Sequence, residues 1–302
     1  MKAASKSKVV VTGGAGFIGS HLVDALVLKG FEVHAIDNLV AGKRENVNSK
    51  AVLHTADIRD LEAIRSIIAG ARYVFHLAAL PRVQFSIKHP RETNEANVGG
   101  TLNVLIASAE AKVKRFVYGS SSSAYGGQTT LPLREGMTPH PKSPYGLQKL
   151  IGEEYCRVWS AVYDLPTVSL RYFNVYGPGQ PSEGAYALVI AKFLKQRQEG
   201  KPLTITGDGK QTRDFTHVRD VVRANLLAAK SPKVGKGEVI NIGAGRNVSV
   251  NRIAELIGGP TEYISERLEP KDTLADNTLA KKLLGWEPTV AIEEGIAELM
   301  RA

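Results

Sequence analysis

Cysteine is almost absent from this sequence, since Cys156 is the single one among 302 residues. It cannot form a disulfide within the chain, and a chain of this kind suits the reducing cytoplasm, where we expect the protein. Long apolar runs are also missing, and no stretch reaches the roughly 18 residues that would span a bilayer. The lysine-rich N-terminus does not read as a signal peptide, because glycines interrupt the apolar residues that follow it. We therefore expect no membrane partner.

Acidic residues are fewer than basic ones, 30 against 39, which leaves a net charge of +9. A positive balance favours an anionic ligand, such as a phosphorylated one. The basic residues are nevertheless scattered, without the lysine and arginine blocks or aromatic-interleaved stripes typical of nucleic-acid surfaces. We predict no nucleic-acid partner and no metal site, and we interpret most of the charge as solvated surface.

Short β-branched runs alternate with helical segments through the first half of the chain. The predicted strands are Lys8–Thr12, Val33–Ile36, Val52–Thr55, Tyr73–Leu77, Arg115–Tyr118 and Thr167–Tyr172, and the predicted helices are Gly16–Lys29, Leu61–Ala69, Thr93–Ala111 and Pro144–Tyr163. Nearly continuous apolar strands separated by helices indicate an α/β fold with a doubly wound parallel sheet covered on both faces.

The pattern changes after Asn174, where loops rich in glycine and proline appear. Helices are predicted at Ala185–Arg197, Val218–Ala229, Arg252–Ile257 and Leu279–Leu284, with a strand at Val239–Ile242. We interpret residues 1–173 as one domain and residues 174–302 as a smaller α/β lobe, with a segment near 216–242 returning to the first. Such a lobe would close over the carboxyl edge of the sheet, where ligands of open α/β folds bind.

A glycine motif, Thr12-Gly13-Gly14-Ala15-Gly16-Phe17-Ile18-Gly19, lies between the first predicted strand and helix. Gly13 permits a tight turn, Gly16 lets the backbone approach a pyrophosphate, and Gly19 allows close helix–strand packing. The helix N-terminus then directs free N–H groups at the phosphates. The motif predicts a dinucleotide-binding Rossmann domain.

Asp37 ends the second predicted strand, 18 residues after Gly19. A carboxylate there accepts hydrogen bonds from ribose hydroxyls and repels a 2′-phosphate, which favours NAD over NADP. Asp37 could instead be a turn residue, and Lys43 and Arg44 could in principle reach a 2′-phosphate. NAD is the cofactor we predict.

Tyr145 and Lys149 are four residues apart in a predicted helix that begins with the N-cap Ser143 and Pro144. They therefore share one helix face. A tyrosine with a pKa of about 10 can act as a base near neutrality only if that pKa falls by about 3 units. A nearby ammonium, the helix N-terminus and an oxidised nicotinamide would all favour the phenolate. An exposed helix face is the plainer interpretation of this spacing, but its occurrence downstream of a dinucleotide motif favours catalysis.

Serines 120 to 123 follow the predicted strand Arg115–Tyr118. Side chains at the carboxyl end of a parallel strand face the ligand crevice, although serine is also common in loops that end strands. One of these hydroxyls could bind a substrate oxygen beside Tyr145.

Taken together, these motifs make the chain resemble the extended short-chain dehydrogenase/reductase family, and within it the nucleotide-sugar epimerases of the UDP-glucose 4-epimerase type. The resemblance runs from end to end, through GGAGFIGS, His76-Leu77-Ala78-Ala79, Asn97-Val98-Gly99-Gly100-Thr101, SSSSAYG, SPYGLQK, Arg171-Tyr172-Phe173-Asn174-Val175-Tyr176-Gly177-Pro178, Gln211-Thr212-Arg213-Asp214-Phe215 and Leu284-Gly285-Trp286.

The resemblance implies a mechanism in which Tyr145 takes the proton of the sugar 4-hydroxyl, Lys149 holds the nicotinamide ribose and lowers the tyrosine pKa, and Ser121 completes the catalytic group. It implies cofactor contacts at Gly13, Gly16, Phe17, Ile18, Asp37, Asn38, Ala41, Gly42, Asp57, Ile58, Leu77, Ala78, Ala79, Asn97, Tyr145, Lys149, Tyr172 and Phe173. Substrate contacts are implied at Ser121, Ser122, Ser123, Tyr145, Asn174, Leu188, Thr204, Arg213, Arg267 and Thr273.

The same resemblance implies the reaction class and the sugar. Dehydratases of the superfamily carry an Asp-Glu pair, and decarboxylases a glutamate, where this chain has serines and no carboxylate between Gly119 and Gly126. Epimerisation of UDP-glucose and UDP-galactose is therefore expected. Thr273 matches a size gate, and a small residue there would admit UDP-GlcNAc and UDP-GalNAc.

Three further expectations accompany this one. Arg82 would suit a uronate, which makes a UDP-glucuronate 4-epimerase the main alternative. A sensor that binds NAD without chemistry is a weaker one, because such relatives typically lose the tyrosine or the lysine. The helices Thr93–Ala111 and Pro144–Tyr163 commonly form a homodimer in the family, and apolar residues such as Val104 and Val158 permit this here, although core packing needs such residues too.

Overall fold

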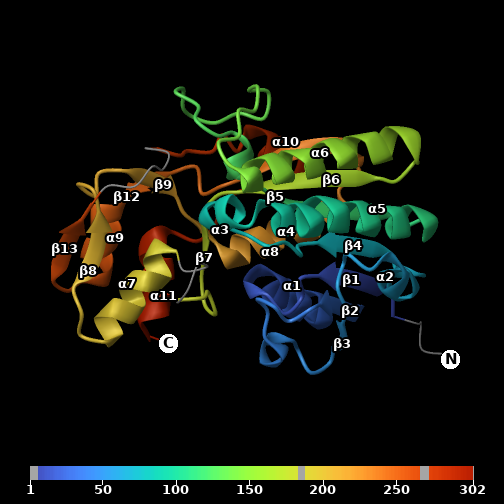
Figure 1. Cartoon of the computed structure of the whole chain (residues 1–302), viewed down its shortest axis with the longest axis horizontal. Helices are drawn as coiled ribbons and strands as arrows, with labels where there is room; N and C mark the ends of the chain where they lie inside the picture. The colour runs from blue at the N-terminus through green and yellow to red at the C-terminus, as the bar shows by residue number, and fades with distance from the viewer. Residues whose placement is uncertain (1–5, 183–187, 266–271, 302) are drawn as a thin grey trace.

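A seven-stranded parallel sheet forms the centre of the computed structural model, which describes residues 6–182, 188–265 and 272–301 (Figure 1). Its strands are β1 (Lys8–Thr12), β2 (Glu32–Asp37), β3 (Val52–Thr55), β4 (Tyr73–His76), β5 (Arg115–Ser121), β6 (Thr167–Tyr172) and β11 (Lys236–Ile242). They lie in the order β11-β6-β5-β4-β1-β2-β3. The direction of winding reverses between β1 and β4, which is the switch point where doubly wound sheets bind ligands. The predicted fold class is confirmed.

Helices cover both faces of this sheet because alternate strand residues point to opposite sides. Val9 and Val11 pack on one side with α1 (Phe17–Leu28), α8 (Val218–Lys230) and α10 (Thr278–Leu284). Val10 packs on the other side with α2 (Leu61–Ile68), α5 (Gly100–Glu110) and α6 (Pro144–Val162). Figure 1 shows α6 and α5 lying over one face and α1 and α8 over the other.

The helix predicted at Thr93–Ala111 is longer and less regular than expected. It begins at Pro90 as α4 (Pro90–Asn94), passes through a π-helical turn, η2 (Glu95–Gly99), and continues as α5. A short helix, α3 (Val83–Lys88), precedes it and was not predicted. Two 3₁₀ turns, η1 (Arg44–Asn46) and η3 (Ser122–Ala124), complete the first half.

In the second half, the described residues form three two-stranded sheets and three helices around a separate apolar cluster. These elements are β7 (Val175–Tyr176) with β10 (Thr216–His217), β9 (Thr212–Asp214) with β12 (Asn247–Ser249), β8 (Leu203–Thr206) with β13 (Thr261–Ile264), and α7 (Val189–Gln198), α9 (Val250–Ile257) and α11 (Ile292–Arg301). Sequence reasoning missed α11 and the short strands. It placed the start of α7 at Ala185, which lies outside the described residues.

The chain returns to the central sheet as β11, which pairs with β6 from Lys236 onward rather than from Val239 as predicted. A register shift between Lys236 and Glu238 interrupts this pairing around Gly237, which explains why the apolar pattern begins late. Within the described ranges, no helix combines the length and apolar character needed to cross a membrane.

Candidate active site

The glycine motif forms a close-packed turn between β1 and α1. Gly13 has a φ of +71°, and a Cβ atom there would lie 2.7 Å from the Ala78 backbone nitrogen. A Cβ at Gly19 would lie only 2.0 Å from the Gly13 carbonyl oxygen. Because no side chain caps the N-terminus of α1, its first N–H groups, at Phe17 and Ile18, remain suited to an anion. The turn therefore fits a dinucleotide pyrophosphate.

The Asp37 carboxylate lies at the end of β2 and joins two backbone segments. It accepts hydrogen bonds from the Ala15 nitrogen at 3.0 Å and from the Leu39 nitrogen at 2.8 Å. A carboxylate has about four acceptor positions, so these two bonds leave capacity for ribose hydroxyls. The loop through Ala41 and Gly42 passes close by, since a Cβ at Gly42 would lie 2.9 Å from an Asp37 oxygen.

Asn38 and Asp57 meet beside this position, at the carboxyl ends of β2 and β3. The Asn38 amide donates to Asp57 at 3.0 Å, and Arg59 binds the same carboxylate through two nitrogens. The Arg59 hydrogen bonds are the main reason that the pKa of Asp57 is lowered to about 2. Ile58 follows with its side chain packed against Gly100. The structure thus gathers these predicted cofactor residues around the end of β2.

Other residues predicted to bind the cofactor lie at neighbouring strand ends. The Leu77 and Ala78 nitrogens donate to Thr12, directly before the glycine motif, and Ala79 follows. A Cβ at Gly119 would meet the Leu77 and Tyr172 side chains, so these three residues are closely packed against one another. Phe173 comes next, with a fully buried ring and a backbone nitrogen that donates to the Ile242 carbonyl at 3.1 Å.

Tyr145, Lys149 and Ser121 are brought together by α6 and the end of β5. Ser143 caps α6 by accepting from the Gly146 nitrogen at 3.1 Å. The Ser121 hydroxyl lies close enough to the Tyr145 phenol to lower its pKa. The Lys149 ammonium is buried, donates to the Gly119 carbonyl at 2.8 Å, and lies 5.9 Å from the centre of the Tyr145 ring. Tyr145 itself stays partly exposed, as a group that meets a substrate must.

The expected lowering of the Tyr145 pKa is not found in the protein by itself. Burial raises the pKa of this phenol, and it outweighs the Ser121 hydrogen bond and the positive charge of Arg82, both of which lower the pKa. Burial also lowers the pKa of Lys149 to about 8, against the opposing pull of Glu153. The Lys149 ammonium is directed to the Gly119 carbonyl. Its lowering of the Tyr145 pKa together with a bound oxidised nicotinamide stays a prediction.

Asn97 holds the loop after β4 from inside the π-helical turn. Its amide accepts from the Leu80 nitrogen at 2.7 Å and donates to the Leu80 carbonyl and to Gln148 on α6. The side chain is buried, so this geometry supports an indirect contribution to the cofactor site. Ser86 on α3 makes a second link, because it accepts from the Tyr145 nitrogen at 3.0 Å. Neither Gln148 nor Ser86 was predicted, although Ser86 stands in the Pro81–Ser86 segment that also contains Arg82.

Asn174, Arg213 and Thr273 come together around Asp214 in the second lobe. Asn174 donates to the Asp214 carbonyl at 3.2 Å, and the Thr273 hydroxyl accepts from the Asp214 nitrogen at 3.2 Å. The Asp214 carboxylate accepts three backbone N–H bonds, from Ala244, Gly245 and Ala275. Burial raises its pKa to about 6 in spite of those bonds. Asp214, which sequence reasoning passed over, thus joins the loops that carry the predicted substrate residues.

The remaining predicted substrate residues are placed elsewhere. Leu188 precedes the first turn of α7, and Thr204 on β8 is bound by Gln196 of the same helix at 3.0 Å. Arg267 lies outside the described residues. Ser122 and Ser123 form the 3₁₀ turn after Ser121, where the Ser121 hydroxyl bonds Ser123 at 3.1 Å.

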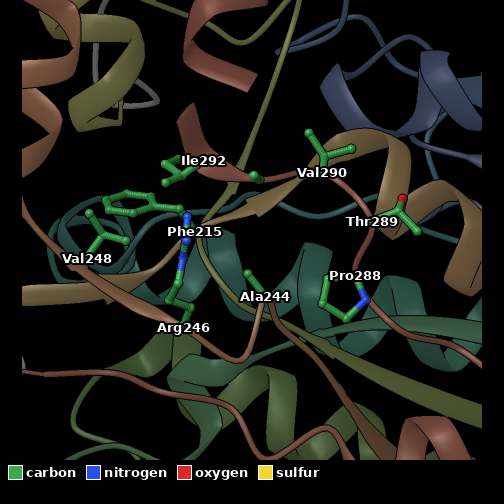
Figure 2. Close-up of a pocket in the computed structure, with 9 residues that line it drawn as sticks. Phe215, Ala244, Arg246, Val248, Pro288, Thr289, Val290 and Ile292 are labelled. Carbon is green, nitrogen blue, oxygen red and sulfur yellow. The ribbon is translucent and has the colours of Figure 1, made fainter. Parts of the chain in front are cut away.

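A cavity of about 170 Å³ lies in the second half of the chain (Figure 2). It is lined by Phe215, Ala244, Arg246, Val248 and residues 288–292. The Arg246 guanidinium is paired with Glu293 at 2.8 Å. Because the cavity contains none of the catalytic group, we assign it no ligand.

Comparison with known proteins decides the family. Residues 9–243 match the NAD dependent epimerase/dehydratase family. The chain belongs to that family. It is 38% identical over 306 residues to UDP-glucose 4-epimerase of Mycolicibacterium smegmatis, covering 96% of each chain. The family is NAD-dependent, which confirms the predicted cofactor and the enzyme class.

Two solved structures show the same likeness. UDP-glucose 4-epimerase from Thermotoga maritima, determined with UDP-glucose, is 40% identical with a TM-score of 0.93 and 97% coverage of each chain. UDP-N-acetylglucosamine 4-epimerase from Methanobrevibacter ruminantium M1, in complex with UDP-N-acetylmuramic acid, is 36% identical with a TM-score of 0.93 and 98% coverage of each. The predicted resemblance to nucleotide-sugar epimerases is confirmed.

Proposed function

We propose that this member of the NAD-dependent epimerase/dehydratase family interconverts UDP-sugars that differ at C4. The observation that carries the proposal is the Tyr145 phenol, whose pKa the Ser121 hydroxyl lowers, one helical turn before the buried Lys149 on α6. Likeness over nearly the whole chain to epimerases of UDP-glucose and UDP-N-acetylglucosamine supports it.

In this proposal Tyr145 takes the proton of the sugar 4-hydroxyl, and Ser121 donates a hydrogen bond to the same oxygen. NAD, when bound, would supply the hydride acceptor and donor for C4, so that no net redox change would result. Lys149 holds the nicotinamide ribose and supplies positive charge beneath the phenol. Since burial alone raises the pKa of Tyr145, cationic neighbours are needed to make the phenolate accessible near neutrality.

The second lobe holds the nucleotide sugar in the same proposal, and residues 1–173 hold the cofactor. Asn174 and Arg213 bind the diphosphate, for which a guanidinium fork is suited. Thr273 lies beside Asn174, with 3.4 Å between the Asn174 amide nitrogen and the Thr273 hydroxyl oxygen, and faces the sugar. Arg267, Leu188 and Thr204 remain proposed contacts from the family resemblance.

The sugar specificity is tested by incubating the protein and NAD with UDP-glucose, UDP-galactose, UDP-GlcNAc, UDP-GalNAc and UDP-glucuronate, and following each anomeric proton by NMR. We expect turnover of the hexoses and of the acetylated sugars, because threonine at position 273 is small. A Thr273→Tyr variant should lose the acetylated sugars and keep the hexoses. Failure of the wild type to convert acetylated sugars while UDP-galactose reacts would refute this specificity.

UDP-glucuronate is the second candidate, and Arg82 favours it. This residue precedes α3 and has a backbone φ of +95°, which is uncommon for residues other than glycine. Its charge acts on the Tyr145 phenol, so it lies near the place where the reacting sugar would bind. If UDP-glucuronate is the preferred substrate in the panel, Arg82→Gln should raise its KM and leave that of UDP-glucose unchanged.

We further propose that the protein is a cytoplasmic homodimer paired through α5 and α6. Apolar side chains on α6 and at its end are exposed, including Val158 (38%), Val162 (65%) and Tyr163 (56%), and such patches favour an interface. Light scattering should give the mass of two chains for the wild type and of one chain for Val158→Glu/Val162→Glu. A wild type that elutes as a monomer at micromolar concentration contradicts the dimer.

A further inference from the structure

A buried ion pair lies beneath the catalytic group, and the chemistry proposed above leaves it without a role. Glu153 on α6 and Arg171 on β6 bind each other through two hydrogen bonds, at 2.8 and 2.6 Å. Their side chains are 1% and 3% exposed. A buried pair of this kind is weak evidence for stability, because removing two charges from water costs about as much as their attraction returns. Its position therefore needs another explanation.

The Glu153 carboxylate joins the helix and the strand that carry the catalytic side chains. Glu153 follows Lys149 by one helical turn and so lies on the same face of α6. It also accepts a hydrogen bond from Ser120 on β5. Ser120 directly precedes Ser121 and faces Arg171 in the strand register. One carboxylate thus sets the position of α6 against β5 and β6.

Glu153 also determines the charge around Lys149. The titratable side chains that face Lys149 are Tyr145, Glu153 and Cys156 from α6, Tyr118 from β5, and His76 from β4. Burial lowers the pKa of His76 to about 3, and it raises the pKa values of Tyr118 and Cys156, so these groups are neutral near pH 7. Among the described residues that face Lys149, Glu153 therefore carries the only negative charge, with Arg171 on the same carboxylate.

We propose that Glu153 is a positioning residue of the epimerase reaction. Its carboxylate keeps Lys149 cationic and holds the Ser121 strand at Tyr145. The Arg171 guanidinium offsets the cost of burying the Glu153 charge. This inference rests on the proposed roles of Tyr145 and Lys149. Arg171 adds a further restraint, since its guanidinium lies 4.3 Å from the centre of the Tyr125 ring.

The pH dependence of kcat tests the charge effect in two opposite variants. Glu153→Gln keeps the shape and can still accept from Ser120, but it removes the negative charge beside Lys149. In a plot of kcat against pH, activity falls on the alkaline side where Lys149 loses its proton. In Glu153→Gln this alkaline limb should move to lower pH by about one unit or more. Arg171→Gln leaves the carboxylate uncompensated, so the limb should move to higher pH. A purely structural role would lower kcat by the same factor at every pH.

Folding and NAD binding are monitored by thermal unfolding and by cofactor titration. If a single variant does not fold, Glu153→Gln/Arg171→Gln carries the test, since it buries no unpaired charge. That double variant should show an alkaline limb between those of Glu153→Gln and the wild type. Limbs that coincide with the wild type in every folded variant overturn the proposal. Turnover that survives Tyr145→Phe would instead remove the catalytic roles themselves, which separates the two failures.

Discussion

Tyr145→Phe is expected to lower kcat by about three orders of magnitude or more, because the variant keeps the ring and loses the group that accepts the substrate proton. The Ser121 hydroxyl acts on this phenol and lowers its pKa. NMR detection of the two epimers in a fixed time gives the rate directly. The substitution leaves the glycine turn and Lys149 in place, so the affinity for NAD should stay within a few fold of the wild type.

This pair of measurements also separates the enzyme from a sensor that binds NAD without chemistry. If the protein were a sensor, the wild type and Tyr145→Phe would bind NAD with the same affinity, and neither would turn over a UDP-sugar. Unchanged turnover in Tyr145→Phe would contradict the mechanism. Ser143→Thr is a suitable control, because threonine can also cap α6 and leaves the phenol untouched.

Gly19→Ala is expected to reduce the affinity for NAD by at least about tenfold, since overpacking costs roughly 1–3 kcal/mol and each 1.4 kcal/mol is a factor of ten. A Cβ at this position would lie 2.0 Å from the Gly13 carbonyl oxygen and 2.8 Å from its carbon. Both are backbone atoms of the dinucleotide turn, which must move to make room. Titration of NAD by calorimetry measures the loss, and thermal unfolding reports any loss of stability.

Gly99→Ala is the matched control for this variant. Gly99 also lies in a helical segment, but a Cβ there would meet nothing within 4 Å. The control should bind NAD as the wild type does. Equal affinities in Gly19→Ala and Gly99→Ala would show that the turn adapts without cost, and the argument for a close-packed pyrophosphate site would fail.

Local patterns predicted the strands of the central sheet and the helices beside them well. Val9, Val10 and Val11 are all apolar, and a strand with two buried faces requires this. The amphipathic helix α11 was missed although its apolar residues recur with helical spacing. The short strands of the second lobe have too few residues to show an alternating pattern. The π-helical turn at Asn97 follows from that side chain's bonds to Leu80 and Gln148, which join residues far apart in sequence.

The residues proposed for catalysis and cofactor binding could be named from motifs, because each chemical task needs a fixed spacing along one strand end or one helix face. Glu153 obeys the same spacing after Lys149 and could have been found in that way. Arg171 and Asp214 could not, because their importance depends on which charges and N–H groups the fold brings to them. The rise that burial causes in the pKa of Tyr145 could not be predicted either, since the direction of the Lys149 ammonium and the extent of burial are tertiary properties.

The amino-acid order alone determined the doubly wound fold, the dinucleotide turn and the pairing of Tyr145 with Lys149, because each depends on residues that are close in sequence. Only the tertiary structure decided that Ser121 meets the phenol, that Lys149 points to the Gly119 carbonyl, and that Glu153 and Arg171 lie buried beneath them. Those contacts join separate strands and helices, and their strength depends on the exclusion of water, which no local pattern records.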